Sequence, residues 1–215
     1  MFLVVTGTTP PGVTSRTARP RRAEVRARIL DAAAAVVAER GLAAASLDQV
    51  AAAAGFTKGA VYSNFASKDE LFLALLETQV ADRVAAVERT LDTARTVPEA
   101  LAAVSADLAR PDPRTQLLAV EFWQRAVRDP SVGEAFAESR RRLRAQVVEV
   151  AAAFLAGLPE DPGWTPEELA LVVLALANGL AFEELADPAS VPPGLAARVL
   201  GALVGGGTDP AETDS

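Results

Sequence analysis

The chain has 215 residues, with 21 Lys and Arg, 28 Asp and Glu, no Cys and no His. The length allows one or two domains, and the missing residue types exclude disulfide scaffolds, thiolate nucleophiles, most zinc sites and most hydrolase triads. Half of the residues are apolar, 46 are Ala and 5% are aromatic, so we expect a soluble, all-α protein with no metal and no cofactor.

Charge is distributed unevenly along the chain. Residues 1–68 carry nine basic and four acidic groups, a net charge of +5, whereas the other 147 residues carry 12 basic and 24 acidic groups, a net charge of −12. A basic segment on an acidic chain indicates a local contact with a polyanion. The alternative is that the arginines between residues 16 and 28 form a solvated arm without a partner.

Neither a membrane span nor a secretory signal is expected. The longest uncharged apolar stretch, Leu169 to Phe182, has 14 residues, fewer than the ~20 that cross a bilayer. The apolar run at Met1–Val5 has five residues and no basic residue before it, too little for a signal peptide. These observations predict a cytoplasmic protein that contacts no membrane.

The first 66 residues are predicted to form an arm and three helices. Residues 1–20 are rich in Thr, Pro, Gly and Arg and should be a flexible basic arm. A helix begins at Arg21 and stops at Gly41. Ser46 opens a short helix with a capping box, and Gly55 ends it. Thr57 caps a third helix of about seven residues that runs through Asn64.

A second capping box at Ser67 starts a long fourth helix. Prolines and caps divide the remaining chain into five more helices. They begin at Pro98, after Pro113, at Ser131 (to about Gly157), at Thr165 (to about 186) and after Pro193 (to about 204). We therefore expect nine helices in two domains, residues 21–66 and 67–204, followed by a disordered tail at 205–215.

The second and third helices have the pattern of a helix-turn-helix unit. Ala51 supplies the small residue where the two helices cross, and Gly55 tolerates a positive φ in the turn. Apolar side chains at four positions face inward, namely Val50, Phe56, Val61 and Phe65.

The outward face of the third helix is small and polar, with Gly59, Ala60, Tyr62 and Ser63. Such a face lets a helix enter the major groove of DNA, where Ala and Ser contact bases. The only two lysines of the chain, Lys58 and Lys68, flank this helix. The alternative is a helical hairpin with a solvated face, although a Gly in the first turn then costs about 1 kcal/mol without a return in packing.

Residues Arg22 to Glu77 resemble the tetracycline-repressor (TetR) family. The resemblance rests on Ile29–Ala33, Ala45–Ala51 and Gly55–Leu71, and on the spacing Gly-x-x-x-Gly-x-x-Tyr-x-x-Phe-x-x-Lys from Gly55 to Lys68. It implies an N-terminal helix-turn-helix DNA-binding domain and a C-terminal helical domain for ligand binding and dimerisation. It also implies a homodimeric repressor that a small ligand releases from a double-stranded DNA operator.

The resemblance places the DNA contacts on nine residues. They are Ser46, Asp48, Lys58, Gly59, Ala60, Tyr62, Ser63, Asn64 and Lys68. Asp48 is acidic where family members often carry Arg or another polar residue. Because a carboxylate cannot hold a phosphate, Asp48 is expected either to read a cytosine amine or to make no contact.

Residues 169–185 are apolar on nearly all sides, so more than one neighbour must cover them. The resemblance implies a dimer through helices at about 165–186 and 193–204. The alternative is the central helix of a monomer.

Candidate ligand-binding residues lie in the C-terminal part of the chain. They are Phe122, Trp123, Phe136, Phe154 and Asn178, with Trp164, Gln124 and Arg125 as further candidates. A cavity lined by these residues favours a hydrophobic or aromatic molecule. The alternative is that the aromatic residues are ordinary core. Residues 140–144 are expected to be a solvated basic face.

Three functions are compatible with these patterns. The first is a homodimeric repressor that a small hydrophobic ligand releases from DNA. The second is a constitutive or architectural DNA-binding protein without an inducer. The third is a helical small-molecule carrier or enzyme, which no phosphate-binding loop or nucleophile motif supports.

Overall fold

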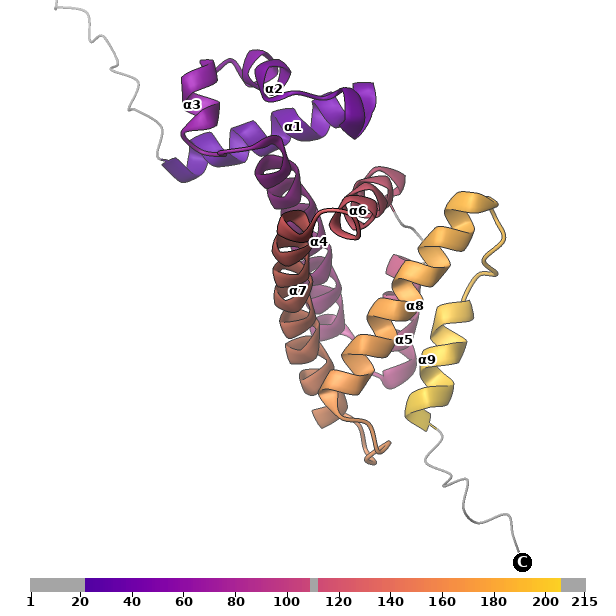
Figure 1. Cartoon of the computed structure of the whole chain (residues 1–215). Coiled ribbons are helices and arrows are strands. Elements are labelled where there is room, and N and C mark those ends of the chain that lie inside the picture. The colour runs from indigo at the N-terminus through magenta and orange to yellow at the C-terminus, as the bar shows by residue number, and fades with distance from the viewer. Residues whose placement is uncertain (1–21, 109–111, 206–215) are drawn as a thin grey trace, which may run out of the picture.

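The computed structural model describes residues 22–108 and 112–205 (Figure 1). In these ranges the chain forms nine α-helices and no β-strand, which confirms the predicted all-α class. The helices are α1 Arg22–Ala44, α2 Leu47–Ala54, α3 Lys58–Tyr62, α4 Lys68–Thr93, α5 Val97–Leu108, α6 Pro113–Ala126, α7 Pro130–Ala156, α8 Pro166–Ala186 and α9 Leu195–Gly205. The predicted arm and residues 206–215 of the predicted tail lie outside the described residues.

Two capping boxes are fully formed, the predicted one at Ser46 and one at the predicted helix start at Thr165. At the start of α2 the Ser46 hydroxyl accepts from the Gln49 backbone N–H, and the Gln49 side chain accepts from the Ser46 N–H. Thr165 and Glu168 exchange the same pair of hydrogen bonds at the start of α8. Each box satisfies two N–H groups that a helix start otherwise leaves unpaired.

Other helix ends differ from the prediction for local reasons. α3 ends at Tyr62, because Ser63 and Asn64 both donate side-chain hydrogen bonds to the carbonyl of Ala60 and so compete with the helical ladder. α7 begins at Pro130 instead of Ser131, because the Asp129 carboxylate accepts the Ser131 N–H and acts as the cap.

At the start of α4 only half of the predicted box is present. Ser67 accepts from the Glu70 N–H, but the Glu70 carboxylate accepts from the N–H of Ala66, one residue before the cap. Near the end of α1 the chain does not stop at Gly41. Gly41 interrupts the helix with φ 76 and ψ 159, a conformation that favours glycine, and one further turn reaches Ala44.

Helices α1–α3 form a head, and α4–α9 form a body. The head core includes the fully buried Ile29, Val50, Val61 and Phe65. The same hydrophobic cluster continues through α4 to Phe122 of α6 and neighbouring residues of the body. The head is therefore packed onto the body through a shared core.

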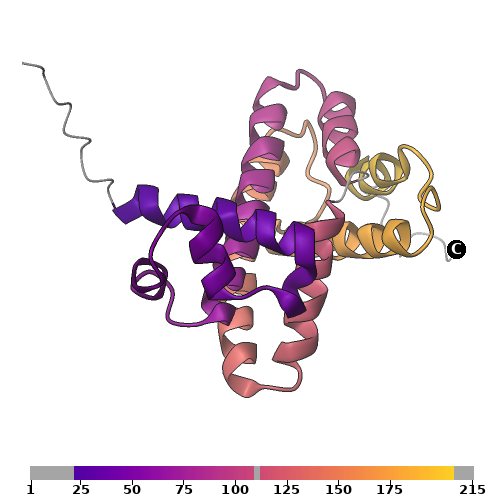
Figure 2. The same ribbon diagram turned by 90° about the horizontal axis from the view of Figure 1, so that it is seen from above.

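In the body, α4 and α7 run side by side below the head (Figure 1). Two smaller clusters hold the remaining helices, one between α7 and α8 around Ala170 and one among α5, α8 and α9 around Leu200. Seen from above, α1 crosses over the body, and α8 and α9 lie on the side away from α3 (Figure 2).

Within the described residues, α8 is the one helix long and apolar enough to cross a membrane by length and composition, and 17% of its apolar window is buried. The 14-residue uncharged stretch counted in the sequence is shorter than the helix that contains it, because α8 has 21 residues. Glutamates lie in its first turn at 167 and 168 and near its end at 183 and 184. One side of α8 packs on its neighbours in the body.

Candidate functional site

The turn between α2 and α3 has the geometry that the sequence predicts for a helix-turn-helix. Gly55 adopts the left-handed conformation, with φ 68 and ψ 29, and its N–H bonds to the end of α2. Ala51 is 2% exposed at the crossing, and Val50 and Val61 are fully buried between the helices. Thr57 caps α3 by accepting the Ala60 N–H. These contacts fix α3 against α2 and leave its other side to solvent.

Two arginines of α1 pack against the helix-turn-helix. The Arg26 guanidinium lies 4.2 Å from the centre of the Phe65 ring and donates to the carbonyl of Asn64 at 3.1 Å. Arg28 lies 4.6 Å from the centre of the Phe56 ring and donates to the last carbonyl of α2, that of Ala54, at 3.4 Å. Each contact combines a cation–π interaction with a hydrogen bond to a backbone carbonyl, which for Arg28 is the last carbonyl of α2. Sequence reasoning placed both arginines in a basic segment and missed this role.

The outer side of α3 consists of the predicted small and polar groups. Gly59, Tyr62 and Ser63 are exposed, Tyr62 by 51%, and Ala60 is half-buried. A Cβ atom added to Gly59 would meet only the Thr57 hydroxyl, at 4.0 Å. No contact among the described residues therefore requires a glycine there.

Lys58 and Asp48 form an ion pair across the turn. The Lys58 Nζ lies 2.5 Å from Asp48 Oδ2, and both side chains remain about half exposed or more. The hydrogen bond and the charge of Asp48 raise the pKa of Lys58. Asp48 is thus held by a cation of its own chain, an arrangement that the sequence did not predict.

Three more predicted contact residues are engaged within the head. Ser46 caps α2, as described above. Asn64 donates to the carbonyl of Ala60 at 2.8 Å, while its buried side-chain oxygen has no hydrogen-bond partner among the described residues. Lys68 donates to the carbonyl of Ala43 and lies 5.8 Å from the centre of the Phe72 ring. Burial and, next, the charge of Arg125 lower the pKa of Lys68.

An ion pair and the course of α4 connect this head to the body. Arg125 of α6 binds Asp69 in the first turn of α4 through both nitrogens of its fork, one at 2.6 Å. Such bidentate pairs are geometrically specific. Further along α4, Leu71 and Phe72 are fully buried in the shared core, and Val84 lines a cavity in the body. One helix therefore touches both regions.

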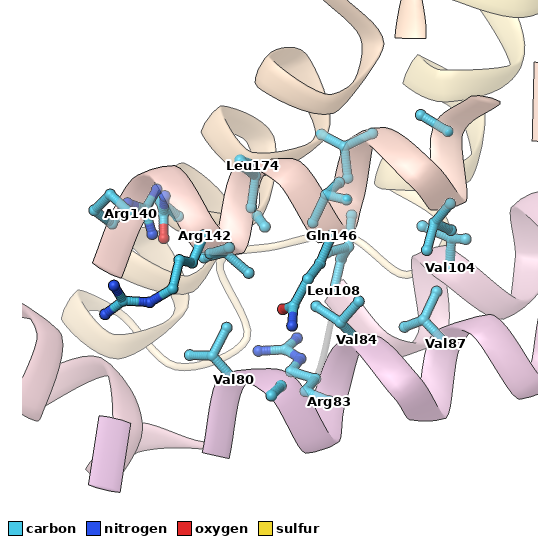
Figure 3. Close-up of a pocket in the computed structure, with 18 of the residues that line it drawn as sticks. Val80, Arg83, Val84, Val87, Val104, Leu108, Arg140, Arg142, Gln146 and Leu174 are labelled. Carbon is cyan, nitrogen blue, oxygen red and sulfur yellow. The ribbon is translucent and has the colours of Figure 1, made fainter. Parts of the chain in front are cut away.

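The cavity has a volume of about 380 Å³ and lies among α4, α5, α6, α7, α8 and α9. This volume falls within the range of small-molecule sites, about 300–1,000 Å³. Valines of α4 form one wall, facing the α7 residues Arg140, Arg142 and Gln146 (Figure 3). Gln146 and Arg83 point toward one another across the space (Figure 3).

Of the predicted ligand-binding residues, Phe136, Phe154 and Asn178 line this cavity. Phe122 is buried instead in the shared core, stacked on Phe136 with the ring centres 6.4 Å apart. Trp123 is 59% exposed. It follows the buried Phe122 in the same helix, and successive side chains of an α-helix point about 100° apart. The prediction that Phe122 and Trp123 line a pocket is therefore wrong for this cavity.

The further candidates also lie outside the cavity lining. Gln124 and Arg125 face solvent and the α4 start, and the Trp164 indole donates to the carbonyl of Leu203 at 3.0 Å. Conversely, two residues that were not predicted to bind a ligand line the cavity. Arg140 and Arg142 are among its lining residues, although the sequence placed them on a solvated face.

The outward side of α8 is an exposed apolar stripe. Its members recur at helical spacing and are Leu171, Ala175, Gly179, Phe182 and Leu185. Leu171 is 53% and Phe182 60% exposed. An added Cβ at Gly179 would meet nothing within 4 Å, so the middle of the stripe is open. A contiguous apolar face of this kind marks an interaction surface.

Sequence profiles match both parts of the chain. Residues 29–75 match the profile described as bacterial regulatory proteins, tetR family. Residues 94–206 match the profile of the C-terminal part of BetI-type transcriptional repressors. Over 84 residues the chain is 40% identical to the HTH-type transcriptional activator FasR of Mycolicibacterium smegmatis, a match that covers 39% of this chain and 38% of that protein. The chain thus matches less than two thirds of that relative's length.

Solved structures match over most of the chain. A transcriptional regulator from Rhodococcus sp. RHA1 is 31% identical, with a TM-score of 0.61 and 84% of this chain and 94% of that chain covered. A transcriptional regulator from Saccharomonospora viridis, solved in complex with choline, has the same fold, with a TM-score of 0.58, 20% identity, and 85% and 96% of the two chains covered. The chain therefore belongs to the TetR family of bacterial transcriptional regulators.

Proposed function

We propose that this protein is a homodimeric transcriptional repressor that binds an operator through α3 and leaves it when a small ligand enters the body cavity. The observation that carries the proposal is the course of α4. Its first turn follows the recognition unit and is tied to Arg125, and its later turns form a wall of the cavity. A ligand that displaces this wall therefore changes the position of the head.

The proposed DNA contacts combine base reading and phosphate binding. Gly59 and Ala60 let α3 lie deep in the major groove, and Ser63 contacts a base edge. The exposed Tyr62 hydroxyl and the Lys58 ammonium reach phosphate oxygens. Ser46, Asn64 and Lys68 lie close to this face, but the structure gives each a partner inside the chain, so their proposed role is to position the others. Asp48 holds the Lys58 ammonium in the free protein and is not proposed to contact DNA.

A second copy of the chain is the proposed cover for the α8 stripe. Dimer formation through about 165–186 and 193–204 would bury Leu171 and Phe182, and Gly179 allows the two helices to approach closely. The profile match to repressor C-terminal domains over residues 94–206 supports this assembly and the repressing role. Two heads in one dimer bind two half-sites about one helical turn apart, roughly 34–36 Å.

The cavity separates the proposal from a constitutive DNA-binding protein. An architectural protein has no use for a space of about 380 Å³ against the helix that supports its recognition unit. Family membership favours a regulator over a carrier or an enzyme. We place this regulator in the cytoplasm, because its proposed operator is double-stranded DNA.

The proposal is tested by a substitution that the fold should accept and DNA should not. Gly59→Leu adds a side chain into open space and replaces a glycine inside a helix, so the stability of the protein should rise or stay unchanged. Affinity for a duplex from the protein's own upstream region, measured by fluorescence anisotropy, should fall by at least ~30-fold because the helix can no longer enter the groove. Ala102→Leu, on the exposed side of α5, is the matched control.

A reporter driven by the same upstream region provides the functional readout. The wild-type protein should lower expression and Gly59→Leu should not. Unchanged DNA affinity of Gly59→Leu would contradict the recognition face, and increased expression with the wild-type protein would contradict the repressing role.

A further inference from the structure

The α7 wall of the cavity contains two arginines, Arg140 and Arg142, and Arg140 lies among apolar side chains. On α7 the cavity-lining residues recur at helical spacing, and they include Phe136, Arg140, Leu143, Val147 and Phe154. Arg140 is half-buried. A guanidinium at this place loses part of its hydration, so a structural role would require an acidic partner.

The neighbouring acidic groups are occupied by other arginines. Arg142 binds both Glu77 and Glu138, and Arg141 also binds Glu138. Arg140 has no hydrogen bond or ion pair with any residue that the structure describes, and its charged neighbour is another cation, Arg144. Burial and, next, the charge of Arg144 lower the pKa of Arg140, which means that its surroundings disfavour the cation.

The charge of the lining also argues against a cationic ligand. Besides Arg140, the lining includes Arg83 and Arg142, whereas its one carboxylate, Glu77, is already bound to Arg142. Arg83 has an interaction of its own and Arg142 is bound to Glu77, so among the described lining residues the unpaired cation is Arg140. A planar guanidinium binds a carboxylate or phosphate through two parallel hydrogen bonds.

Most of the remaining lining is apolar and suits an apolar body. Val80, Val84 and Val87 of α4 face α7 across the space, and Leu174 of α8 borders it (Figure 3). These side chains offer no hydrogen bonds, so they recognise hydrocarbon by burial alone.

We propose that the effector of this protein is an amphipathic organic anion, whose carboxylate or phosphate head binds Arg140 and whose apolar body lies along the valines of α4. This inference rests on the proposed function, since it takes the cavity to be the effector site. It explains why Arg140 has no partner among the described residues while the carboxylates of Glu77 and Glu138 are bound to other arginines. It also gives the ligand a grip on both α7 and α4, the helix that supports the head.

Isothermal titration calorimetry on the full-length protein tests the inference with probes of equal chain length. These are dodecanoate, dodecyl phosphate, dodecanol and dodecyltrimethylammonium, each below its micellar concentration. We expect one or both anions to bind more tightly than dodecanol, and the cation to bind most weakly. The two anions distinguish a carboxylate head from a phosphate head.

Variants at α7 then assign the preference to one residue. Arg140→Gln should weaken binding of the preferred anion about 10- to 100-fold and leave dodecanol binding unchanged, because a bond between charged groups is lost. Arg140→Lys, which keeps the charge without the fork, should fall between the two. Arg141→Gln, on the solvent side and paired with Glu138, is the matched control and should bind like the wild type.

The outcomes separate this inference from the proposed function. Equal affinity for the anions, alcohol and cation, failure of all four probes to bind, or an unchanged anion affinity in Arg140→Gln would overturn the inference. Operator binding by the ligand-free protein, measured alongside, is independent of these results. Its absence would overturn the proposed function, whereas operator binding that dodecanol and dodecanoate release equally well would overturn the anion preference alone.

Discussion

Replacing Asp48 by Asn should tighten DNA binding, because Asp48 holds the cation that faces the DNA. In the free protein Lys58 Nζ lies 2.5 Å from the Asp48 carboxylate. Lys58 must leave this carboxylate before it binds a phosphate. The carboxylate itself also repels the phosphate backbone. Asn is nearly the same size and removes both effects.

The size of the effect follows from the exposure of the pair. The two side chains are 68% and 47% exposed, and exposed ion pairs contribute about 0.2–1 kcal/mol, so breaking this one costs about 0.5 kcal/mol. Repulsion between the carboxylate and a phosphate about 8 Å away in water adds roughly 0.5 kcal/mol. The sum is about 1 kcal/mol per subunit and about 2 kcal/mol per dimer, which is a gain in affinity of roughly 30-fold.

Fluorescence anisotropy at several salt concentrations measures this gain and its cause. One freed cation per subunit should steepen the slope of log K against log salt by about 0.9 for each subunit. Glu88→Gln, an exposed body residue, makes the same change of net charge away from the head and should have no comparable effect. Weaker binding by Asp48→Asn with an unchanged slope would refute the reasoning, since it would mean that Asp48 reads a base or holds Lys58 in its binding position.

Three further predictions concern stability and assembly. Arg26→Ala should lower the free energy of unfolding by about 1–3 kcal/mol in urea titrations, because the hydrogen bond to the Asn64 carbonyl and the contact with Phe65 are lost. Arg22 is exposed, so Arg22→Ala should change the free energy of unfolding by less than about 0.5 kcal/mol. Gly179→Leu should leave the monomer folded by circular dichroism but abolish dimers in sedimentation equilibrium, and dimers of unchanged affinity would rule out the α8 stripe as the interface. Hydrogen bonds from Thr165 lower the pKa of Glu168 in the folded protein, so the unfolded state binds the proton more readily. The resulting contribution to the free energy of unfolding is present above the unfolded pKa and is lost as the pH falls through the folded pKa. Glu168→Gln should flatten that part of the stability profile, and an unchanged acid dependence would show that the box does not contribute to it.

Local chemistry made the fold and the recognition unit predictable from sequence. The caps at Ser46, Thr57 and Thr165 and the turn at Gly55 depend on residues within three or four positions of one another. The helical period also identified the inward residues of the head. Some errors at helix ends arose where a neighbouring side chain competed for the same backbone group, as Asn64 does at the end of α3, and the helix also continues past Gly41.

The contacts that shape the site were harder to predict, because they join distant parts of the chain. Arg26 bonds to a carbonyl 38 residues away, and Arg125 binds a carboxylate 56 residues away. Composition describes such arginines only as basic. The cavity itself depends on how α8 is placed against α4 and α7, which no local pattern encodes.

The position of Arg140 did have a signal in the sequence. It follows Phe136 by four residues and precedes Leu143 by three and Val147 by seven, so all four share one side of a helix. The run of arginines at 140–144 obscured this phase, because a block of like charge is usually solvated. Applying helical phase to each arginine separately would have placed Arg140 on the apolar side.

Selection of duplexes by the purified, full-length protein tests the central claim most directly, namely that a dimer of this chain reads DNA through α3. Genomic fragments that the protein retains are sequenced and compared with those retained by Gly59→Leu. The account predicts that wild-type fragments share a near-palindromic site with half-sites about one helical turn apart, and that Gly59→Leu retains no such set. Fragments without a common sequence, or the same set retained by Gly59→Leu, would contradict it.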